Sequence, residues 1–458
     1  MNALLTPEIL NRYDVAGPRY TSYPTAPEWN STIEKGTYDR HLRLVAGSRD
    51  PLSLYVHIPF CAKLCTYCGC NVAIRKNWPK YGDEYLDMLE LEFAMVADRL
   101  GVRKSLQQMH WGGGTPTFLS APQLGRLFDL VTRHFDLDAK AEIAIEIEPR
   151  TVDPELLAFL RHLGFNRVSM GVQDFDPKVQ EAVNRVHSYE RILEVYEACR
   201  KLDFLSINMD LIYGLPFQTR STFRDTIQKI VQLKPNRIAL YSFAHIPWLK
   251  KQQQRIDPLA LPRPEEKVNI FLDATEGLLS GGYQAIAMDH FALADDEMAI
   301  AYREDRLHRN FMGYTVLPGD DFLGLGVSSI GYVAGAYFQN TKDLMEYRSA
   351  LEKGEWPLEK ELVLTQDDLM RRSVIVELMC RFKLDRSAWS QKHGLHFDEV
   401  FAIEKPHIQH CLEDGLLVEQ GAMLQVTELG KLFVRNVAMG FDAHLRKVGG
   451  HRRFSRVI

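Results

Sequence analysis

Four of the seven cysteines of this chain lie together in the segment CAKLCTYCGC, at residues 61–70. Cys61, Cys65 and Cys68 have the spacing C-x3-C-x2-C, and thiolates this close together can hold one metal centre. Zinc sites usually pair two short clips across a longer stretch, and no second clip follows nearby. An iron–sulfur cluster accepts three or four thiolates from one short loop. Three ligands on a four-iron cluster leave one iron open for an outside ligand, and Cys70 is the alternative fourth ligand.

The remaining cysteines, Cys199, Cys380 and Cys411, are scattered along the chain. That is not the pattern of a disulfide framework, and it fits a reducing cytoplasm. The net charge of −5 gives no strong attraction to nucleic acid or membranes. The sequence has no apolar run of ~18 residues that would span a bilayer, and its N-terminus lacks the pattern of a secretory signal. We therefore expect a cytoplasmic protein with no membrane insertion and no nucleic-acid partner.

The cysteine segment follows the first of six apolar-rich runs that alternate with longer helical patterns up to about residue 282. The predicted strands are 52–58, 107–111, 142–147, 167–173, 206–212 and 237–243. Six such units predict a parallel sheet wrapped by helices. The alternation is compatible with most of a (β/α) barrel and also with a doubly wound sheet.

The predicted strands have one apolar face and one polar face. In 206–211, for example, Ile207, Met209 and Leu211 oppose Asn208 and Asp210. The apolar face is expected to pack on the helices, which leaves the polar face pointing into the barrel. A buried carboxylate without a partner is costly there, so a polar lumen calls for a ligand or a wet cleft. The alternative is a sheet with one solvated face; in a barrel, the site is expected at the carboxyl ends of the strands.

The three-cysteine motif, placed after a first strand and ahead of GGGTP (112–116), resembles the radical S-adenosylmethionine (SAM) superfamily. Longer matches resemble one family within it, the oxygen-independent coproporphyrinogen III oxidases of haem biosynthesis. These matches are GPRYTSYPTA (17–26), LYVHIPFCAKLCTYCGCN (54–71), HWGGGTPT (110–117), RVSMGVQDF (167–175), NMDLIYGLP (208–216), MDHFA (288–292), HRNF (308–311) and the C-terminal RRFSRVI. They run from near the first residue to the last.

The resemblance implies the activity and the cofactors. In this family a [4Fe-4S] cluster and SAM generate a 5′-deoxyadenosyl radical, which takes a hydrogen from the β-carbon of a substrate propionate. Loss of carbon dioxide and one electron then leaves a vinyl group. Two such reactions convert coproporphyrinogen III to protoporphyrinogen IX. We therefore expect an oxidoreductase, a coproporphyrinogen dehydrogenase, with a tetrapyrrole substrate and an electron donor such as a flavodoxin or ferredoxin, and we expect a monomer.

The resemblance also implies site residues. The cluster ligands are Cys61, Cys65 and Cys68. The positions that match contacts of the cluster-bound SAM are Tyr55, Gly113, Glu146, Gln173, Arg185 and Asp210. The family can bind a second SAM, and the matching positions are Tyr67, Gly114, Thr115, Ala244 and Ile330. The candidates for catalytic roles are Tyr55, Glu146 and Arg185.

The substrate of this family carries four carboxylates and needs cationic or hydrogen-bonding partners. The candidates in the sequence are Arg19, Tyr20, His290 and Arg309. Other positions depart from the family pattern, among them Val72, Leu293 and Met312. They leave open whether the second SAM site is intact and which tetrapyrrole is recognised.

We predict an α/β fold: a partial (β/α)6 radical-SAM barrel with an N-terminal lid segment and a mainly helical, winged-helix-like C-terminal domain. The predicted divisions are an N-terminal extension or lid (1–50), the barrel core (51–282), a barrel extension with substrate-site segments (283–358) and the C-terminal domain (359–458). The alternatives in function are a paralogous radical-SAM enzyme acting on another tetrapyrrole, a haem-trafficking protein that keeps the cluster, and a zinc-clip protein that binds nucleic acid.

Overall fold

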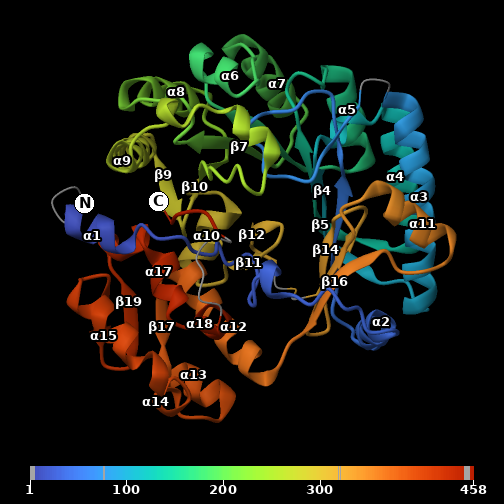
Figure 1. Ribbon diagram of the computed structural model, residues 1–458. Coiled ribbons are helices and arrows are strands. Elements are labelled where there is room, and N and C mark those ends of the chain that lie inside the picture. Colours follow the sequence, from blue (N-terminus) through green and yellow to red (C-terminus); the bar gives the residue numbers. More distant parts are fainter. Residues whose placement is uncertain (1–5, 76–77, 318, 320, 448–453, 458) are drawn as a thin grey trace.

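The structure is a computed structural model that describes residues 6–75, 78–317, 319, 321–447 and 454–457 (Figure 1). The six predicted strands are present. They are β1 (Leu52–Ile58), β4 (Ser105–Gly113), β5 (Asp136–Ile147), β6 (Arg167–Gln173), β7 (Ser206–Tyr213) and β8 (Arg237–Ser242). Neighbouring strands pair in parallel in the order of the chain, without the reversal that a doubly wound sheet requires. The predicted partial (β/α)6 barrel is therefore confirmed.

Helices cover the outer face of this sheet (Figure 1). They are α3 (Trp78–Leu100), α4 (Ala121–His134), α5 (Pro154–Leu163), α6 (Pro177–Ala182), α7 (Tyr189–Lys201), α8 (Arg220–Leu233) and α9 (Pro264–Ser280). Their starts are set locally: the Ser120 side chain and Gln123 form a capping box ahead of α4, for example. The strand side chains between sheet and helices, such as Leu54, Val56 and Ile145, are completely buried. The apolar face predicted from the sequence is therefore the face that packs on the helices.

The strand register places the polar faces side by side. Tyr55 of β1 is opposite His110 of β4, Glu146 of β5 is opposite Ser169 of β6, and Gly171 of β6 is opposite Asp210 of β7. Each of these residues is partly exposed while its neighbours along the strand are buried. The polar residues therefore form one continuous surface inside the curved sheet.

The sheet is longer than the sequence predicted. It continues beyond β1 with β13 (Phe322–Leu325), which is parallel to β1, and then with β14 (Ile330–Val333), β15 (Ala336–Asn340) and β16 (Leu358–Val363), all antiparallel. Beyond β8 it continues with the antiparallel strands β10 (His290–Leu293) and β9 (Tyr283–Ile286). Among the described residues, β16 and β9 are the two ends of this sheet, so the barrel is partial.

Shorter elements connect and extend this framework. The strands are β2 (Phe60–Cys61) with β3 (Ala73–Ile74), and β11 (His308–Asn310) with β12 (Gly313–Thr315). The helices are α1 (Pro7–Tyr13), α2 (Thr37–Gly47), α10 (Glu297–Arg303) and α11 (Leu344–Glu352). No helix in the described part of the chain combines the length and apolarity needed to cross a bilayer.

The C-terminal region forms its own core, drawn in orange and red in Figure 1. Its helices are α12 (Gln366–Arg381), α13 (Arg386–His393), α14 (Phe397–Val400), α15 (Lys405–Glu413), α16 (Glu428–Leu432), α17 (Val434–Met439) and α18 (Ala443–Lys447). A three-stranded sheet has the order β17 (Lys383–Asp385), β19 (Met423–Val426), β18 (Leu417–Gln420). This arrangement agrees with the predicted mainly helical, winged-helix-like domain.

The N-terminal segment packs into that C-terminal core. Tyr20 and Tyr23 are only 4% and 1% exposed and belong to the same apolar cluster. The Tyr20 hydroxyl donates to Asp442 at 3.0 Å, and the Arg435 guanidinium donates to the carbonyls of Gly17 and Pro18. Deleting this segment would therefore remove core side chains, so a lid role for it has to be tested by single substitutions.

Candidate functional site

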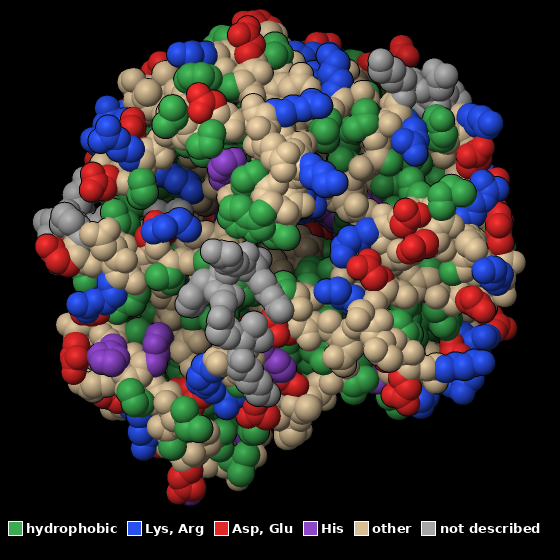
Figure 2. All heavy atoms as spheres, in the orientation of Figure 1, with side chains coloured by type: hydrophobic (Ala, Val, Ile, Leu, Met, Phe, Trp, Pro, Cys, Tyr) green, Lys and Arg blue, Asp and Glu red, His purple; other side chains and the backbone are tan. Residues whose placement is uncertain are grey.

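A cavity of about 460 Å³ lies at the carboxyl ends of the barrel strands, between the strands and the cysteine loop. It brings together most of the residues singled out from the sequence. Those that line it are Cys61, Cys65, Tyr67, Cys68, Gly113, Gly114, Thr115, Glu146, Gln173, Arg185 and Asp210. Figure 2 shows a hollow near the centre of one face of the molecule, with Lys and Arg side chains on its rim.

The cysteine loop begins at β2 and returns to pair with β3. The Cys61 thiol lies 3.4 Å from the Thr115 hydroxyl, and the Cys70 backbone N–H donates to the Cys68 sulfur over 3.4 Å. The described residues contain no group of three His, Cys, Asp or Glu side chains close enough to hold a single metal ion. The three thiols line the same cavity, and their close spacing in one short loop is typical of an iron–sulfur cluster.

A short 3₁₀ helix, η3 (Lys251–Arg255), fastens the cysteine loop to the end of β8. The Gln252 side chain donates to the Cys68 carbonyl at 2.6 Å. The Gln253 side chain donates to the carbonyls of Tyr67 and Ala244 at 3.0 and 3.1 Å, and accepts from the Ile246 N–H at 2.6 Å. Sequence reasoning missed these residues, because a run of three glutamines has the appearance of solvated surface.

The glycine run after β4 allows the backbone to approach its neighbours closely. A Cβ on Gly112 would lie 2.8 Å from the Glu146 carboxyl carbon, and one on Gly113 would lie 2.5 Å from the His57 ring. Gly113 also has a φ of +114°, which other residues rarely adopt. Its N–H donates to Glu146 at 3.0 Å. The run therefore holds Glu146 as well as shaping the cavity.

Glu146 is ionised in a polar network at the base of the cavity. Burial raises the pKa of its carboxyl, but the hydrogen bond and charge of His110 and the N–H of Gly113 outweigh burial and hold it below its usual range. Tyr55 stacks on His110, with a centroid distance of 5.9 Å, and its hydroxyl lies 3.0 Å from Nδ1 of His57. These contacts fix the Tyr55 ring and the Glu146 carboxylate in the lumen.

Arg185 lies beside the cysteine loop. Its guanidinium forms an ion pair with Glu148 at 2.6 Å, donates to the Gly171 carbonyl at 2.6 Å, and lies 3.7 Å from the Cys65 sulfur. Glu148 lies on the polar face of the 142–148 alternation but was not among the predicted site residues, because its partner is 37 positions away in the sequence. The Arg185 Nε and the Gln173 Oε1 are buried without a hydrogen-bond partner among the described residues. Such orphaned polar atoms fit a site made for a polar ligand.

Asp210 faces the same cavity from β7. It accepts from Asn208 at 2.8 Å and from Ser169 at 3.1 Å. Burial, and then the negative charge of Glu146, raise the pKa of Asp210 to about 6. Ionised Asp210 therefore lowers the stability of the unliganded protein. This is expected of a carboxylate that serves as an acceptor for ligand hydroxyls.

Two residues predicted for a second SAM lie elsewhere. Ala244 lines a separate cavity of about 460 Å³ together with Lys267. Ile330 packs in an apolar cluster around Trp29 and Phe322. The structure thus brings Tyr67, Gly114 and Thr115 to the cysteine-lined cavity and leaves Ala244 and Ile330 outside its lining.

Comparison with known proteins agrees with this geometry. Residues 55–230 match the Radical SAM superfamily, and residues 364–433 match the HemN C-terminal domain. The oxygen-independent coproporphyrinogen III oxidase of Synechocystis is 45% identical, over 98% of this chain and 97% of its own. The protein of that name from Escherichia coli K12 is 43% identical, over 98% of each. The solved structure of coproporphyrinogen III oxidase (HemN) from Escherichia coli, described as a radical SAM enzyme, superposes with a TM-score of 0.89 and 41% identity, and covers 94% of this chain and 100% of that one.

The fold and the cysteine-lined cavity define a radical SAM protein: a partial barrel that holds an iron–sulfur loop at the carboxyl ends of its strands. The relatives match almost from end to end and narrow this class to one family. The chain belongs to the oxygen-independent coproporphyrinogen III oxidase family.

Proposed function

We propose that this protein oxidatively decarboxylates two propionate side chains of coproporphyrinogen III to vinyl groups and so forms protoporphyrinogen IX. The observation that carries the proposal is the cavity in which the three-cysteine loop and the polar faces of β1, β4, β5, β6 and β7 meet, in a chain of this family. The match to relatives named coproporphyrinogen III oxidase favours this function over haem trafficking, and a zinc-clip protein would give no reason for the orphaned polar groups beside the thiols.

Cys61, Cys65 and Cys68 would hold the [4Fe-4S] cluster and leave one iron open to SAM. When bound, the cluster and SAM supply a 5′-deoxyadenosyl radical that takes a hydrogen from a propionate β-carbon. Glu146 would accept hydrogen bonds from the SAM amino group, as its ionised carboxylate and fixed position allow. Its role is to orient the ligand, since it is hydrogen-bonded by the protein on two sides.

Arg185, Asp210 and Tyr55 would complete the SAM site. Arg185 keeps its position through Glu148 and the Gly171 carbonyl, and its unpartnered Nε offers a donor for the SAM carboxylate. Asp210 would accept from the ribose hydroxyls. Tyr55 is not in the lining of the cavity, but it is fixed between His57 and His110 and would support Glu146 through His110.

Some parts of the proposal rest on the family resemblance alone. A flavodoxin or ferredoxin would supply the electron, the protein would act as a monomer in the cytoplasm, and the loop residues Tyr67, Gly114 and Thr115 would contact a second SAM. If the second SAM site exists, equilibrium dialysis with labelled SAM should find two SAM molecules bound per chain. One SAM molecule per chain would mean that only the cluster-bound SAM is present.

The function is tested by an oxygen-free assay of the reconstituted protein with reductant, SAM and coproporphyrinogen III. We expect protoporphyrinogen IX, carbon dioxide and 5′-deoxyadenosine, and none of these with Cys68→Ala as the control. 5′-Deoxyadenosine without a vinyl product would point to a paralogue that uses another tetrapyrrole. Tight haem binding with no turnover would instead favour a trafficking protein.

A further inference from the structure

Two arginine side chains at the mouth of the barrel, Arg19 and Arg309, lie near the carboxylate of Asp289 but form no ion pair with it. The Arg19 guanidinium lies 5.6 Å from the centre of the Tyr241 ring. The Arg309 guanidinium lies 4.4 Å from the centre of the Tyr314 ring, and its only hydrogen bond to a described residue is a long one, 3.5 Å, to the Arg19 carbonyl. Neither forms an ion pair within 4.0 Å with any carboxylate of the described chain.

This arrangement is unfavourable unless something else binds there. A guanidinium has five N–H donors and no acceptor, so these two offer ten donors for one long hydrogen bond. The Arg309 Nε is buried and has no partner among the described residues. Buried polar groups in folded proteins are nearly always hydrogen-bonded, and buried charges are nearly always paired. The nearby Asp289 Oδ2 is also buried without a partner among the described residues, but one carboxylate oxygen cannot accept from all of these donors, which leaves most of them free for an anion from outside the described chain.

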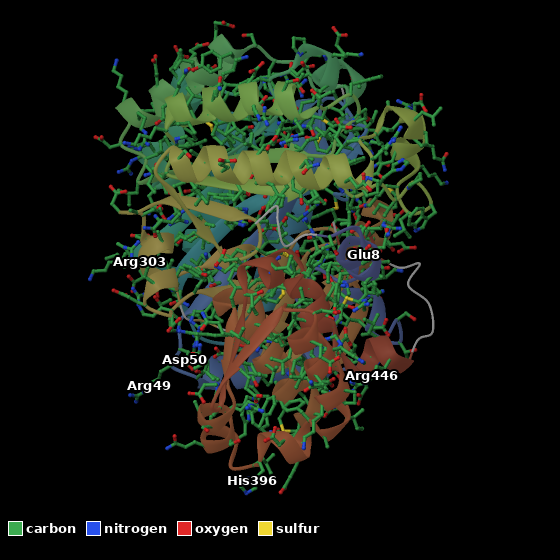
Figure 3. All side chains as sticks on the ribbon, turned by 90° about the vertical axis from the view of Figure 1, so that its left-hand side faces the viewer. Glu8, Arg49, Asp50, Arg303, His396 and Arg446 are labelled. Atoms are coloured by element: carbon green, nitrogen blue, oxygen red, sulfur yellow. The ribbon has the colours of Figure 1, made fainter. Side chains whose placement is uncertain are left out.

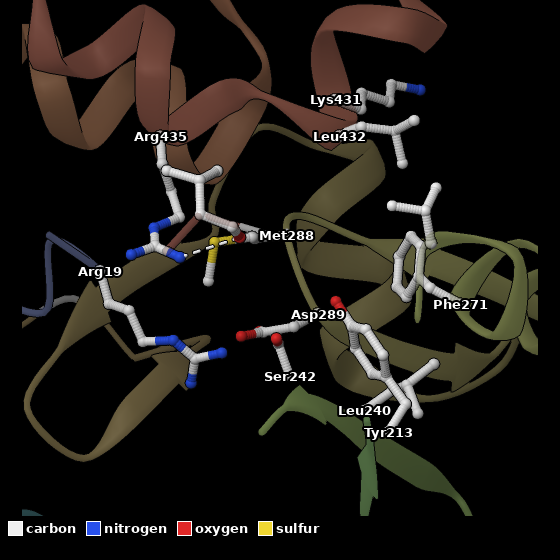
Figure 4. Close-up of a pocket in the computed structure, with 12 residues that line it drawn as sticks. Arg19, Tyr213, Leu240, Ser242, Phe271, Met288, Asp289, Lys431, Leu432 and Arg435 are labelled. Atoms are coloured by element: carbon white, nitrogen blue, oxygen red, sulfur yellow. Dashed lines mark hydrogen bonds between the residues drawn. The ribbon is translucent and has the colours of Figure 1, made fainter. Parts of the chain in front are cut away.

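The surrounding charges support an anion site. One carboxylate, Asp289, lies close by, and its hydrogen bond to His290 at 2.7 Å uses one oxygen. Figure 4 shows the Arg19 guanidinium pointing toward Asp289, with Arg435 on the same side of this small space. Burial, followed by the charge of Arg19, lowers the pKa of Arg435 to about 9. Three guanidiniums thus gather around a single carboxylate, and positive charge is in excess.

The position of these side chains relates them to the cofactor cavity. Tyr241, on which Arg19 rests, also lines the cysteine-lined cavity together with Asp210. The free spaces beside Arg19 and Arg309 are small, about 50 and 10 Å³. The space beside Arg19 can admit a carboxylate or a few water molecules, and the space beside Arg309 can admit about one water molecule. A tetrapyrrole ring would need the larger cavity next to them.

We propose that Arg19 and Arg309 together bind one propionate carboxylate of the tetrapyrrole, and that this propionate is not the one being decarboxylated. The proposal rests on the proposed function, because it takes the anion from that substrate. A reacting propionate must release its carboxyl group as neutral carbon dioxide. Two guanidiniums would stabilise its charged ground state and oppose that release. Their use is to anchor a spectator propionate, so that another propionate of the ring extends toward the cofactors.

The test compares Arg19→Gln, Arg309→Gln and the control Arg303→Gln. Arg303 is on α10, extends from the surface (Figure 3), and donates only to Gln284 and the Ala294 carbonyl. Binding of coproporphyrin III, a stable analogue with four carboxylates, is followed by fluorescence quenching. Loss of a charged hydrogen-bonding partner predicts binding weaker by roughly 10- to 100-fold for each site variant and unchanged for the control. The KM for coproporphyrinogen III should rise in parallel, with iron content unchanged.

Arg309→Lys is a second variant for the case that Arg309→Gln fails to fold. It keeps the charge and should recover part of the affinity, and added salt should weaken its binding of coproporphyrin III. Unchanged affinity and KM in both site variants would overturn the proposal, even if the wild type makes protoporphyrinogen IX. Conversely, a wild type that makes no protoporphyrinogen IX would overturn the proposed function, while a loss of coproporphyrin III binding in the site variants would still support the carboxylate site.

Discussion

Replacing Gln253 with leucine tests whether the η3 segment holds the cluster loop in place. Gln253 is 1% exposed, and its amide makes three hydrogen bonds, to the carbonyls of Tyr67 and Ala244 and from the N–H of Ile246. Leucine has a similar size but no polar atoms. Gln253→Leu therefore leaves three backbone groups without partners while largely keeping the packing.

The size of the effect follows from these three groups. Leaving a buried backbone group unsatisfied costs about 1–3 kcal/mol. We take about 1 kcal/mol for each group, because the Tyr67 carbonyl borders the open cavity, and expect the free energy of unfolding to fall by about 3 kcal/mol. If that loss falls on the loop that carries Cys68, the affinity for the cluster drops by roughly 100-fold.

Two measurements separate the possible sites of this loss. Urea denaturation of the apo-protein, followed by far-ultraviolet circular dichroism, gives the free energy of unfolding. Iron release from the reconstituted protein to a chelator, without oxygen, gives the stability of the cluster. Gln254→Leu is the matched control, because its neighbouring amide is exposed and makes one hydrogen bond, of 3.3 Å, to the Pro247 carbonyl. We expect it to stay within about 0.5 kcal/mol of the wild type.

The proposed role of Gln253 is refuted if Gln253→Leu and Gln254→Leu behave alike in both measurements. A loss of folding stability with normal iron retention would refute only part of it. In that case Gln253 supports the end of β8 but does not hold the cysteine loop.

Three further predictions address the cofactor cavity. Cys68→Ala should lose the cluster and Cys70→Ala should keep it, as measured by iron and sulfide content after reconstitution; iron loss in both would make Cys70 a ligand. The pKa of Asp210 is raised to about 6, so its charged form destabilises the apo-protein above about pH 6, by about 3 kcal/mol, and not below about pH 4. Asp210→Asn should thus raise the free energy of unfolding at pH 7.5 and lose this advantage near pH 4; an advantage that grew toward acid pH would contradict the assignment. A Cβ in Gly171→Ala would lie 2.7 Å from Nη2 of Arg185, so we expect roughly tenfold weaker SAM binding by equilibrium dialysis, with normal iron content as the check that the loop is intact.

Elements whose signals are local could be predicted from the amino-acid sequence. The six barrel strands were predicted because alternation of polar and apolar residues depends only on neighbours along the chain. The same alternation identified Asp210 and the polar face around it as the lumen. The cysteine loop could also be predicted, because its three thiols are close in sequence and their spacing suggests an iron–sulfur cluster.

The short strands next to the barrel could not be read in this way. β13 has only four residues, and Phe322, Leu323 and Leu325 are all buried, so the strand shows no alternation of polar and apolar residues. Its pairing with β1 joins residues about 270 positions apart, and only the folded sheet shows that Phe322 is opposite Ser53. Local patterns contain no information on such a pairing.

The site contacts that matter most also join residues far apart in the sequence, and they are visible only in the folded chain. Gln253 reaches Tyr67, Arg309 reaches Arg19, and Tyr20 reaches Asp442 across 422 positions. Each depends on where two elements meet after folding, because burial and hydrogen-bond partners are properties of the packed chain. Residue types and spacing therefore indicated the cluster chemistry. The support of the cysteine loop by Gln253 and the position of Arg19 and Arg309 at the barrel mouth became visible only in three dimensions.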